Sequence, residues 1–346
     1  MKINRKELLI ILSACRPGLA KREIIEEAIR FIFTGDAVAT YNDQICIVYP
    51  YKTDFRCSVN GEEFYKILDG IKEDEVEILV EENQTLVNSR KTKAGLSIVI
   101  GETERVDTLI DNIREATKVR GFWKKLPKDF IEGVFLCMFS ASKDMTTGVR
   151  CCIAVKENKM YSTDSVRVSR YIMDGEIMDE LLIPARDAVE LVKYPVKKYG
   201  ISESWIHFIT DEGVMFNCRM MIGDYPYTID RFFRAPENEF VVPEELQEVM
   251  KNIAIMASGD VDIAKMVEVT IKNDKMICKS EKERGWITKE VAIEGYKGEI
   301  MFYINPIFFA QILTKVTSLF LIQGEEFPDK AVFTRESFQH VMALPA

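Results

Sequence analysis

Cysteine and histidine are the residue types of this chain that could most readily supply nucleophilic, acid–base or metal-binding chemistry. The chain has eight cysteines, none in a Cys-x-x-Cys pair, and only two histidines, His207 and His340, to complete a zinc site. Cysteines scattered in this way are typical of small buried residues in the reducing cytoplasm. His207 lies in a strand-like segment and His340 near the end of the chain, so we expect both to be structural rather than general bases.

Other signatures of catalysis are also missing from the sequence. It has no Gly-rich phosphate loop and no Gly-x-Ser-x-Gly turn. We therefore expect no enzymatic activity, no cofactor and no metal. An enzyme that uses the adjacent Cys151 and Cys152 stays open as a remote alternative, although neighbouring strand residues point to opposite faces, so that only one of the two could line a site.

Composition describes a soluble globular protein. The 346 residues suffice for two to three domains, 47% of them are hydrophobic and 29% charged, and 55 acidic against 46 basic side chains give a net charge of −9. No apolar run approaches the ~20 residues needed to cross a bilayer, and the N-terminus lacks the cleavage site of a secretory signal. We expect a cytoplasmic protein without a membrane partner.

The elements that must position any site follow an internal repeat. Six segments open alike, with an aliphatic residue followed by Asn or Pro, at residues 4, 60, 127, 184, 243 and 305. Asparagine is a good helix N-cap, and proline fits the first turn of a helix. After three openings, at 60, 184 and 305, apolar residues recur at helical spacing, for example Phe64, Ile67 and Leu68. The sequence thus predicts a unit of roughly 60 residues, used six times.

Between the predicted helices, the pattern changes to alternating strands with polar turns. Residues 30–49, 150–172 and 267–286 each read strand, turn, strand, with Gly35-Asp36, Asn158 and Asn273-Asp274 at the turns. Each unit is thus one helix plus several antiparallel strands, and two units form a domain. We predict an α+β fold with three similar domains, at residues 1–120, 121–236 and 237–346. A repeated domain without a catalytic site is typical of a ring or solenoid whose function depends on its shape.

Three segments resemble motifs of one family. Tyr161–Val168 is similar to its Thr-Asp-Gly-His-Arg-Leu strand and turn, Gly223–Pro226 with Thr228 and Arg231 to its Gly-x-Tyr-Pro-x-Thr-x-Arg segment, and Val341–Ala346 to its closing aliphatic-Pro stretch. Each motif alone has low specificity, but they occur in order along the whole chain. The sequence resembles a divergent member of the bacterial DNA polymerase III β sliding clamps.

This resemblance implies a fold and a function. The fold would consist of three clamp domains per chain in a head-to-tail homodimer, with helices lining a ring and sheets outside. The ring would encircle double-stranded DNA without reading its sequence. It would tether a replicative polymerase and so confer processivity, without catalysis of its own. The DNA polymerase and the clamp loader would bind through a short linear motif. A clamp-like protein-binding scaffold that is not loaded on DNA is the alternative.

The resemblance also implies a partner-peptide pocket between the middle and last domains. Carried over by motif, it would be lined by Thr146, Thr163, Ser165, Arg167, Val168, Pro226, Arg231, Phe232, Val332, Met342, Leu344 and Pro345. Small and apolar side chains with arginines at the rim suit a peptide anchor. Ser165 and Val166 replace the family's Gly-His, which implies a different peptide preference.

Basic residues at or after the predicted helices are the candidates for a DNA-facing surface. They are Arg22, Lys72, Lys143, Lys193, Lys197, Lys198, Lys251 and Lys315. The six helix segments are nearly neutral in sum, whereas the whole chain carries −9, so the helical face is less acidic than the rest. Ile255 and Met256 match an apolar pair that the family uses at the seam between subunits.

Overall fold

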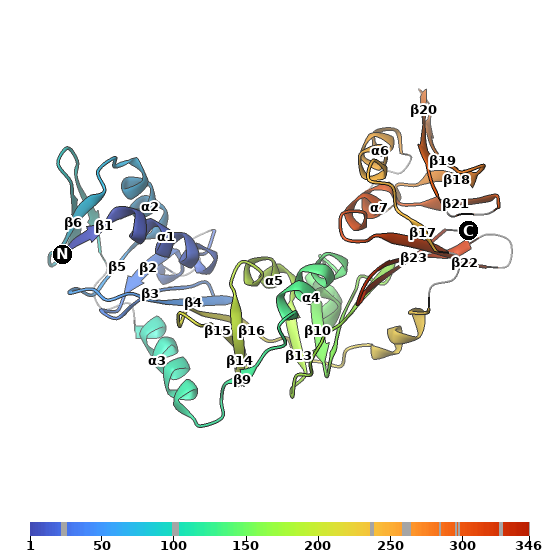
Figure 1. Cartoon of the computed structure of the whole chain (residues 1–346). Helices are drawn as coiled ribbons and strands as arrows, with labels where there is room; N and C mark the ends of the chain where they lie inside the picture. Colours follow the sequence, from blue (N-terminus) through green and yellow to red (C-terminus); the bar gives the residue numbers. More distant parts are fainter. Residues whose placement is uncertain are drawn as a thin grey trace. The chain divides into compact units, whose positions relative to one another are not determined.

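The computed structural model describes residues 1–21, 26–98, 104–235, 239–257, 264–283, 285–294, 296, 298–324 and 328–345. The chain divides into two compact units (Figure 1): Met1–Ile131 with Leu181–Ile222, here unit 1, and Glu132–Glu180 with Gly223–Ala346, here unit 2. Each unit combines short helices with antiparallel sheets, so the predicted α+β class is confirmed. The division into three domains at residues 120 and 236 stays a prediction, because each unit draws on two separate stretches of chain.

Six helices follow the six predicted openings: α1 (Arg5–Cys15), α2 (Gly61–Gly70), α4 (Phe130–Cys137), α5 (Ala185–Leu191), α6 (Leu246–Ile253) and α7 (Pro306–Ile312). The side chains of Asn4, Asn60 and Asn305 cap α1, α2 and α7, since each oxygen accepts hydrogen bonds from backbone amides of the first turn at 3.0–3.1 Å. After Pro127 and Pro243 a turn precedes the helix, so α4 and α6 begin three residues after the proline. None of the described helices is long and apolar enough to span a membrane.

Unit 1 contains two antiparallel sheets. The smaller one has the order β1 (Lys2–Asn4), β6 (Glu75–Val80), β7 (Gln84–Asn88) and β8 (Lys93–Ser97). The larger one has the order β5 (Cys57–Asn60), β2 (Arg30–Phe33), β3 (Ala37–Tyr41), β4 (Ile45–Pro50), β16 (Met215–Arg219), β15 (Trp205–Thr210), β14 (Val196–Ser202) and β9 (Lys124–Lys125). β4 and β16 pair directly, with Ile47 opposite Phe216. β13 (Leu181–Pro184) leads into α5.

Unit 2 repeats this organisation. Its larger sheet contains, as neighbours in this order, β10 (Cys152–Lys156), β11 (Lys159–Thr163), β12 (Arg167–Ile172), β24 (Phe338–Ala343), β23 (Pro328–Arg335), β22 (Ser318–Gln323) and β17 (Phe240–Val241). β12 and β24 pair, with Val168 opposite Val341. A four-stranded sheet has the order β20 (Gly285–Ala292), β19 (Lys275–Lys282), β18 (Val267–Lys272) and β21 (Ile300–Ile304).

The predicted hairpin turns are confirmed. Gly35 links β2 to β3 with φ +90°, and Asn273 and Asp274 link β18 to β19 with φ +50° and +57°. Left-handed backbone at both central positions is the turn geometry that fits the twist of a hairpin. Between β10 and β11 the residue with positive φ is Glu157, and the predicted Asn158 follows it.

The helices bury most of the predicted apolar stripes. Phe64 and Leu68 of α2 and Phe309 and Ile312 of α7 are fully buried, whereas Ile67 is half-buried. Leu246, Met250 and Ile253 form a similar buried stripe on α6. Figure 1 shows α1 beside α2 in unit 1 and α6 beside α7 in unit 2, and residues of both pairs are in contact.

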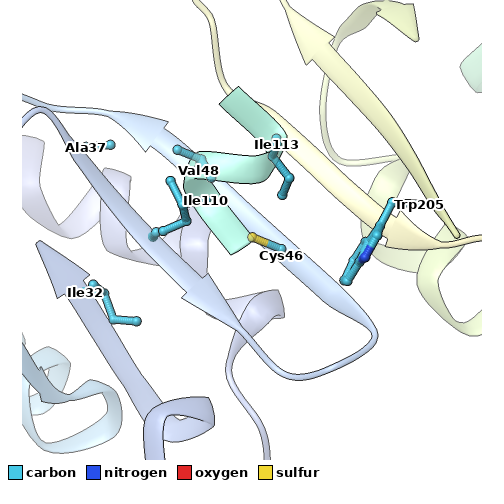
Figure 2. Packing of buried hydrophobic residues seen from close by; sticks show 8 residues of the cluster. Ile32, Ala37, Cys46, Val48, Ile110, Ile113 and Trp205 are labelled. Atoms are coloured by element: carbon cyan, nitrogen blue, oxygen red, sulfur yellow. The ribbon is translucent and has the colours of Figure 1, made fainter. Parts of the chain in front are cut away.

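A seventh helix, α3 (Glu104–Lys118), is not part of the predicted repeat. Its Ile110 and Ile113 pack on the larger sheet of unit 1 against Cys46, Val48 and Trp205 (Figure 2). Arg114 of α3 contacts Asp36 of the β2–β3 turn at 3.0 Å. Residues 104–118, ahead of the predicted boundary at residue 120, therefore form a docked amphipathic helix.

Candidate partner-binding site and basic surface

A cavity of about 320 Å³ lies in unit 2 at the junction of β12 and β24. The cavity is lined by Arg150, Thr163, Ser165, Val166, Arg167, Val168, Pro226, Ile229, Phe232, Lys330, Val341 and Ala343. The lining combines apolar side chains such as Val168, Pro226 and Phe232 with the cations Arg150, Arg167 and Lys330. A cavity of this size with few polar groups suits one or two hydrophobic side chains of a peptide.

The turn between β11 and β12 builds the first wall. The Asp164 Oδ1 atom accepts hydrogen bonds from the amides of Val166 and Arg167, at 3.1 and 2.9 Å. The hydroxyl of Thr163 accepts from the amide of Ser165 (3.1 Å) and donates to the carbonyl of Arg167 (2.8 Å). These bonds hold Ser165 at φ +78°, a left-handed conformation that a non-glycine residue seldom adopts. Ser165 stands where the family motif has glycine.

Arg167 fixes this wall instead of forming a charged rim. Its guanidinium is 4% exposed and donates to the Asp164 Oδ2 atom (2.8 Å), the Gln311 Oε1 atom (2.9 Å) and the Phe139 carbonyl (3.1 Å). It also lies 3.8 Å from the ring centroid of Phe308. A charge satisfied on so many sides is rigid. The other two cations of the cavity also have partners, since Arg150 donates to the Ser165 hydroxyl at 2.6 Å and Lys330 is paired with Asp329.

The opposite wall is a 3-10 turn, Tyr227–Phe232, preceded by Pro226. Asp230 anchors it, because its carboxylate accepts hydrogen bonds from the Tyr161 hydroxyl (2.9 Å) and the Arg170 guanidinium (3.0 Å). Although partial burial acts in the other direction, these bonds lower the pKa of Asp230. The turn thereby presents Ile229 and Phe232 to the cavity.

The structure brings together part of the predicted set. Thr163, Ser165, Arg167, Val168, Pro226 and Phe232 line the cavity, whereas Thr146, Arg231, Val332, Met342, Leu344 and Pro345 are not among the lining residues. Met342 alternates with Val341 and Ala343 along β24, so its side chain points to the other face, where it is buried. Val341 pairs with Val168, so it lies on the face of β24 that lines the cavity. The sequence of β24 alone does not show how this strand is aligned with β12, and therefore does not show which face lines the cavity.

The predicted basic residues have different surroundings. Lys72, Lys143, Lys197, Lys198 and Lys251 are exposed, and Lys193 is exposed but paired with Glu190 at 2.7 Å. Arg22 lies outside the described residues. Exposed lysines without fixed partners are suited to loose phosphate contact, and their facing DNA stays a prediction.

Lys315 does not fit the prediction of a DNA-facing cation. It is 8% exposed, and its ammonium donates to the Phe135 carbonyl at 3.1 Å and lies 3.5 Å from the centroid of the Phe135 ring. Burial lowers its pKa to about 8. Lys315 follows α7, which ends at Ile312, and its ammonium is held by the Phe135 carbonyl rather than by solvent.

The predicted seam residues lie in a short turn after α6. The side chain of Ile255 is 70% exposed, and that of Met256 is half-buried, with its methyl group close to Gly285 at the start of β20. The neighbouring Trp286 is 68% exposed. An exposed apolar group of this kind is typical of a surface that binds another chain.

Both histidines are buried parts of hydrogen-bond networks. The ring nitrogens of His207 contact the Ser202 hydroxyl (2.6 Å) and the side-chain Oδ1 atom of Asn217 (2.7 Å), and burial lowers the pKa of His207. His340 contacts the Ser169 hydroxyl at 2.8 Å. Among the described residues, no group of three or more His, Cys, Asp and Glu side chains could hold a metal ion.

Known proteins of similar structure cover the whole chain. No protein-family model matches the chain, and no curated protein matches it in sequence. Solved structures do match. A DNA polymerase III β-subunit sliding clamp of Pseudomonas aeruginosa has a TM-score of 0.79 at 14% identity, over 100% of this chain and 99% of the other.

Clamps of other bacteria agree. The β subunit of the DNA polymerase of Streptococcus pyogenes has a TM-score of 0.78 at 16% identity, over 99% of each chain. The DNA polymerase III β subunit of Thermotoga maritima has a TM-score of 0.78 at 14% identity, over 100% of this chain and 98% of the other. The resemblance predicted from the sequence is thus confirmed at the level of the fold. The chain has the fold of the bacterial DNA polymerase III β-subunit sliding clamps over its whole length.

Proposed function

We propose that this protein is a DNA sliding clamp, a ring of two chains that encircles duplex DNA and tethers a replicative polymerase to it without catalysing a reaction. The clamp fold supports this function in general. The observation that carries the proposal is the way in which the strands of the repeat join neighbouring sheets.

Two junctions within the chain use equivalent strands. Each of the six predicted units contains three consecutive antiparallel strands. The third strand of each unit is, in chain order, β4, β8, β12, β16, β20 and β24. β4 pairs antiparallel with β16, and β12 pairs antiparallel with β24. Within the part of the chain that the structure describes, the third strands without such a pairing are β8 and β20, each at the end of its four-stranded sheet.

The two remaining third strands complete the pattern if β20 of one chain pairs with β8 of another. After β8, Ile98 forms a single bridge with Val59. An equivalent contact follows β16, where the Met221 amide donates to the Leu182 carbonyl at 3.1 Å, and β16 nevertheless pairs with β4. The bridge at Ile98 is therefore compatible with pairing along the outer edge of β8. An open strand edge is a template for another chain, and a head-to-tail contact of this kind closes a ring when its rotation allows.

The apolar group beside β20 adds a hydrophobic component to this seam. Ile255 and Trp286 are exposed, and the methyl group of Met256 lies close to Gly285. Edge pairing alone would be marginal in water, whereas apolar burial over a specific interface of at least ~1,200 Å² in total gives a stable dimer.

The cavity at the junction of β12 and β24 is the proposed docking site for the polymerase and the clamp loader. A short peptide could place one hydrophobic anchor against Val168, Pro226 and Phe232, while Arg150 and Lys330 attract acidic residues beside the anchor. Tethering raises the effective concentration of the polymerase at the primer end and so increases processivity without a new active site.

Sedimentation equilibrium tests the assembly on which this proposal rests. A ring of two chains has a mass of ~80 kDa, twice the 39.8 kDa of one chain. A mass of 39.8 kDa at micromolar concentration would contradict the proposal. The alternative, a clamp-like scaffold that is not loaded on DNA, predicts the dimer but no stimulation of a polymerase on a long primed template.

A further inference from the structure

One edge of the larger sheet of unit 1 carries a concentration of positive charge. Residues 118–128 contain five basic side chains and residues 193–198 contain three, and neither segment contains an acidic one. The fold joins the two segments, because β9 pairs antiparallel with β14 and Lys125 lies opposite Lys198. On a chain with a net charge of −9, this edge is a distinct electropositive surface.

Three lysines of this edge are exposed and have no counter-charge. Lys118 and Lys193 pair with neighbouring glutamates, whereas Lys125, Lys197 and Lys198 form no ion pair with any residue that the structure describes. Like charges directly opposite each other, such as Lys125 and Lys198, destabilise a sheet. A β-bulge at Lys197 interrupts the alternation of β14, so that two adjacent lysines are both exposed. An anion that binds here relieves this repulsion.

The two faces of this sheet carry different helices. Ala39 of β3 belongs to the hydrophobic cluster that α3 forms with the sheet. The next residue, Thr40, points the other way and donates its hydroxyl to the Cys15 carbonyl of α1 at 2.7 Å. Since successive strand residues point to opposite faces, α3 and α1 cover opposite faces.

The unpaired lysines belong to the α3 face. Lys198 lies opposite Ile209 of β15, and residues directly opposite in an antiparallel pair share a face. Ile209 shares its face with Trp205, four residues earlier on β15, and Trp205 packs in the α3 cluster. Lys125 follows from its pairing with Lys198. The register therefore does not support the prediction that Lys198 lies on the helical side that faces encircled DNA.

Trp123 adds an aromatic ring beside these lysines. It lies two residues before Lys125 and is half-buried. Its ring stands edge-on to Phe122, with 5.1 Å between the centroids. Phe122 packs directly on Gly200 of β14, where a Cβ atom would collide with its ring. Trp123 thus has a fixed neighbour and keeps part of its surface exposed. Lysines beside an accessible aromatic ring are typical of surfaces that bind single-stranded nucleic acid.

We propose that the edge formed by β9 and β14 binds single-stranded DNA. Lys125, Lys197 and Lys198 contact the phosphates, and Trp123 stacks on an unpaired base. Duplex DNA offers the same phosphates but keeps its bases stacked inside, so the tryptophan contact favours the single strand. An acidic protein segment offers negative charge but no base. All four residues belong to unit 1, so this binding does not depend on the proposed ring.

Fluorescence anisotropy tests the surface on the full-length protein, with a labelled oligothymidylate longer than the ~4–16 nucleotides that such a surface contacts. Lys125→Gln combined with Lys197→Gln and Lys198→Gln should weaken binding at least about tenfold at low salt. The slope of log K against log salt should become shallower by about 2, since each phosphate contact to a single strand contributes about 0.7. No measurable binding by the parent protein at low salt would overturn the proposal.

A matched control removes the same charge from exposed lysines elsewhere in unit 1, at Lys52→Gln, Lys66→Gln and Lys91→Gln. It should change the affinity less than about twofold, and a loss equal to that of the first triple variant would reject the assigned surface. Lys198→Glu tests folding separately, because it replaces the repulsion of Lys125 by attraction. Its melting temperature should not fall while its binding weakens; binding as tight as that of the parent would contradict the proposal.

Trp123→Leu separates base stacking from a purely electrostatic contact. We expect several-fold weaker binding of the oligothymidylate with an unchanged salt slope, and loss of the parent's preference for the single strand over a hairpin duplex of equal length. Polyglutamate of equal charge should compete only weakly. If the parent protein binds the duplex as tightly as the single strand, or if polyglutamate competes as well as the oligonucleotide, the surface is not a site for single-stranded DNA.

Discussion

At the scale of single residues, burial rather than residue type decides which charged groups can act. Lys315 and Lys251 line one cavity of unit 2, yet only Lys251 is exposed to solvent. Arg167 and Arg150 line the cavity at the junction of β12 and β24, yet Arg167 is fully hydrogen-bonded inside the wall. A charged side chain that resembles a family's functional residue can therefore be a structural anchor in this chain.

Lys315 makes the stability of the protein depend on pH in a defined direction. The folded chain releases this proton near pH 8, whereas the unfolded chain holds it until about pH 10.4, so between these values the unfolded state binds more protons and stability rises with pH. We expect the free energy of unfolding of the parent protein to rise, relative to Lys315→Met, by on the order of 1–2 kcal/mol from pH 7.5 to 10. Urea unfolding of both proteins at both pH values measures this. A difference that does not change with pH would show that Lys315 titrates normally.

Ala343 tests the peptide cavity. It lines the cavity on β24 but is exposed, so that Ala343→Glu should block an apolar anchor without affecting the core. We expect the affinity for a polymerase-derived peptide to fall at least about tenfold, which corresponds to ~1.4 kcal/mol. Fluorescence anisotropy with a labelled peptide measures it. Thr146→Glu is the matched control, because Thr146 is exposed outside the lining; an equal loss with this variant would place the peptide elsewhere.

At the scale of elements, the sequence predicted the features that a single local segment determines. The Asn caps of α1, α2 and α7 and the turns at Gly35 and Asn273 depend on local backbone chemistry, and the structure confirms them. The choice of Val341 and Ala343 over Met342 was not predictable, since it follows from the register of β24 against β12. Helix α3 was not predicted, because it lies outside the repeat and is held in place by packing of Ile110 and Ile113 against Trp205, which is far away in the sequence.

The seam after α6 is an element-scale prediction. Ile255→Asp combined with Met256→Asp places two charges in the proposed apolar interface, and uncompensated burial of charge costs several kcal/mol. We expect folded monomers by sedimentation with unchanged circular dichroism. Met178→Asp, at an exposed methionine in another part of unit 2, should stay dimeric. A double variant that remains a dimer would mean that the subunits meet at a different surface.

At the scale of the whole molecule, the proposed ring would need no sequence-reading DNA contact. A protein held on DNA by encirclement needs weak, mobile contacts, which exposed lysines such as Lys72, Lys143 and Lys251 can supply on an otherwise acidic chain. Strong phosphate binding would oppose sliding. The net charge of −9 is thus compatible with a topological link to DNA and not with a tight electrostatic one.

Retention on DNA of different topology tests the central claim most directly. The protein is loaded on nicked circular DNA by its clamp loader, separated from free protein by gel filtration, and the DNA is then cut once with a restriction enzyme. An encircling ring stays on the circle, leaves within minutes of linearisation, and shows only weak, salt-sensitive binding to short linear duplex. Retention on linear DNA with free ends, or no retention on the intact circle, would contradict the ring.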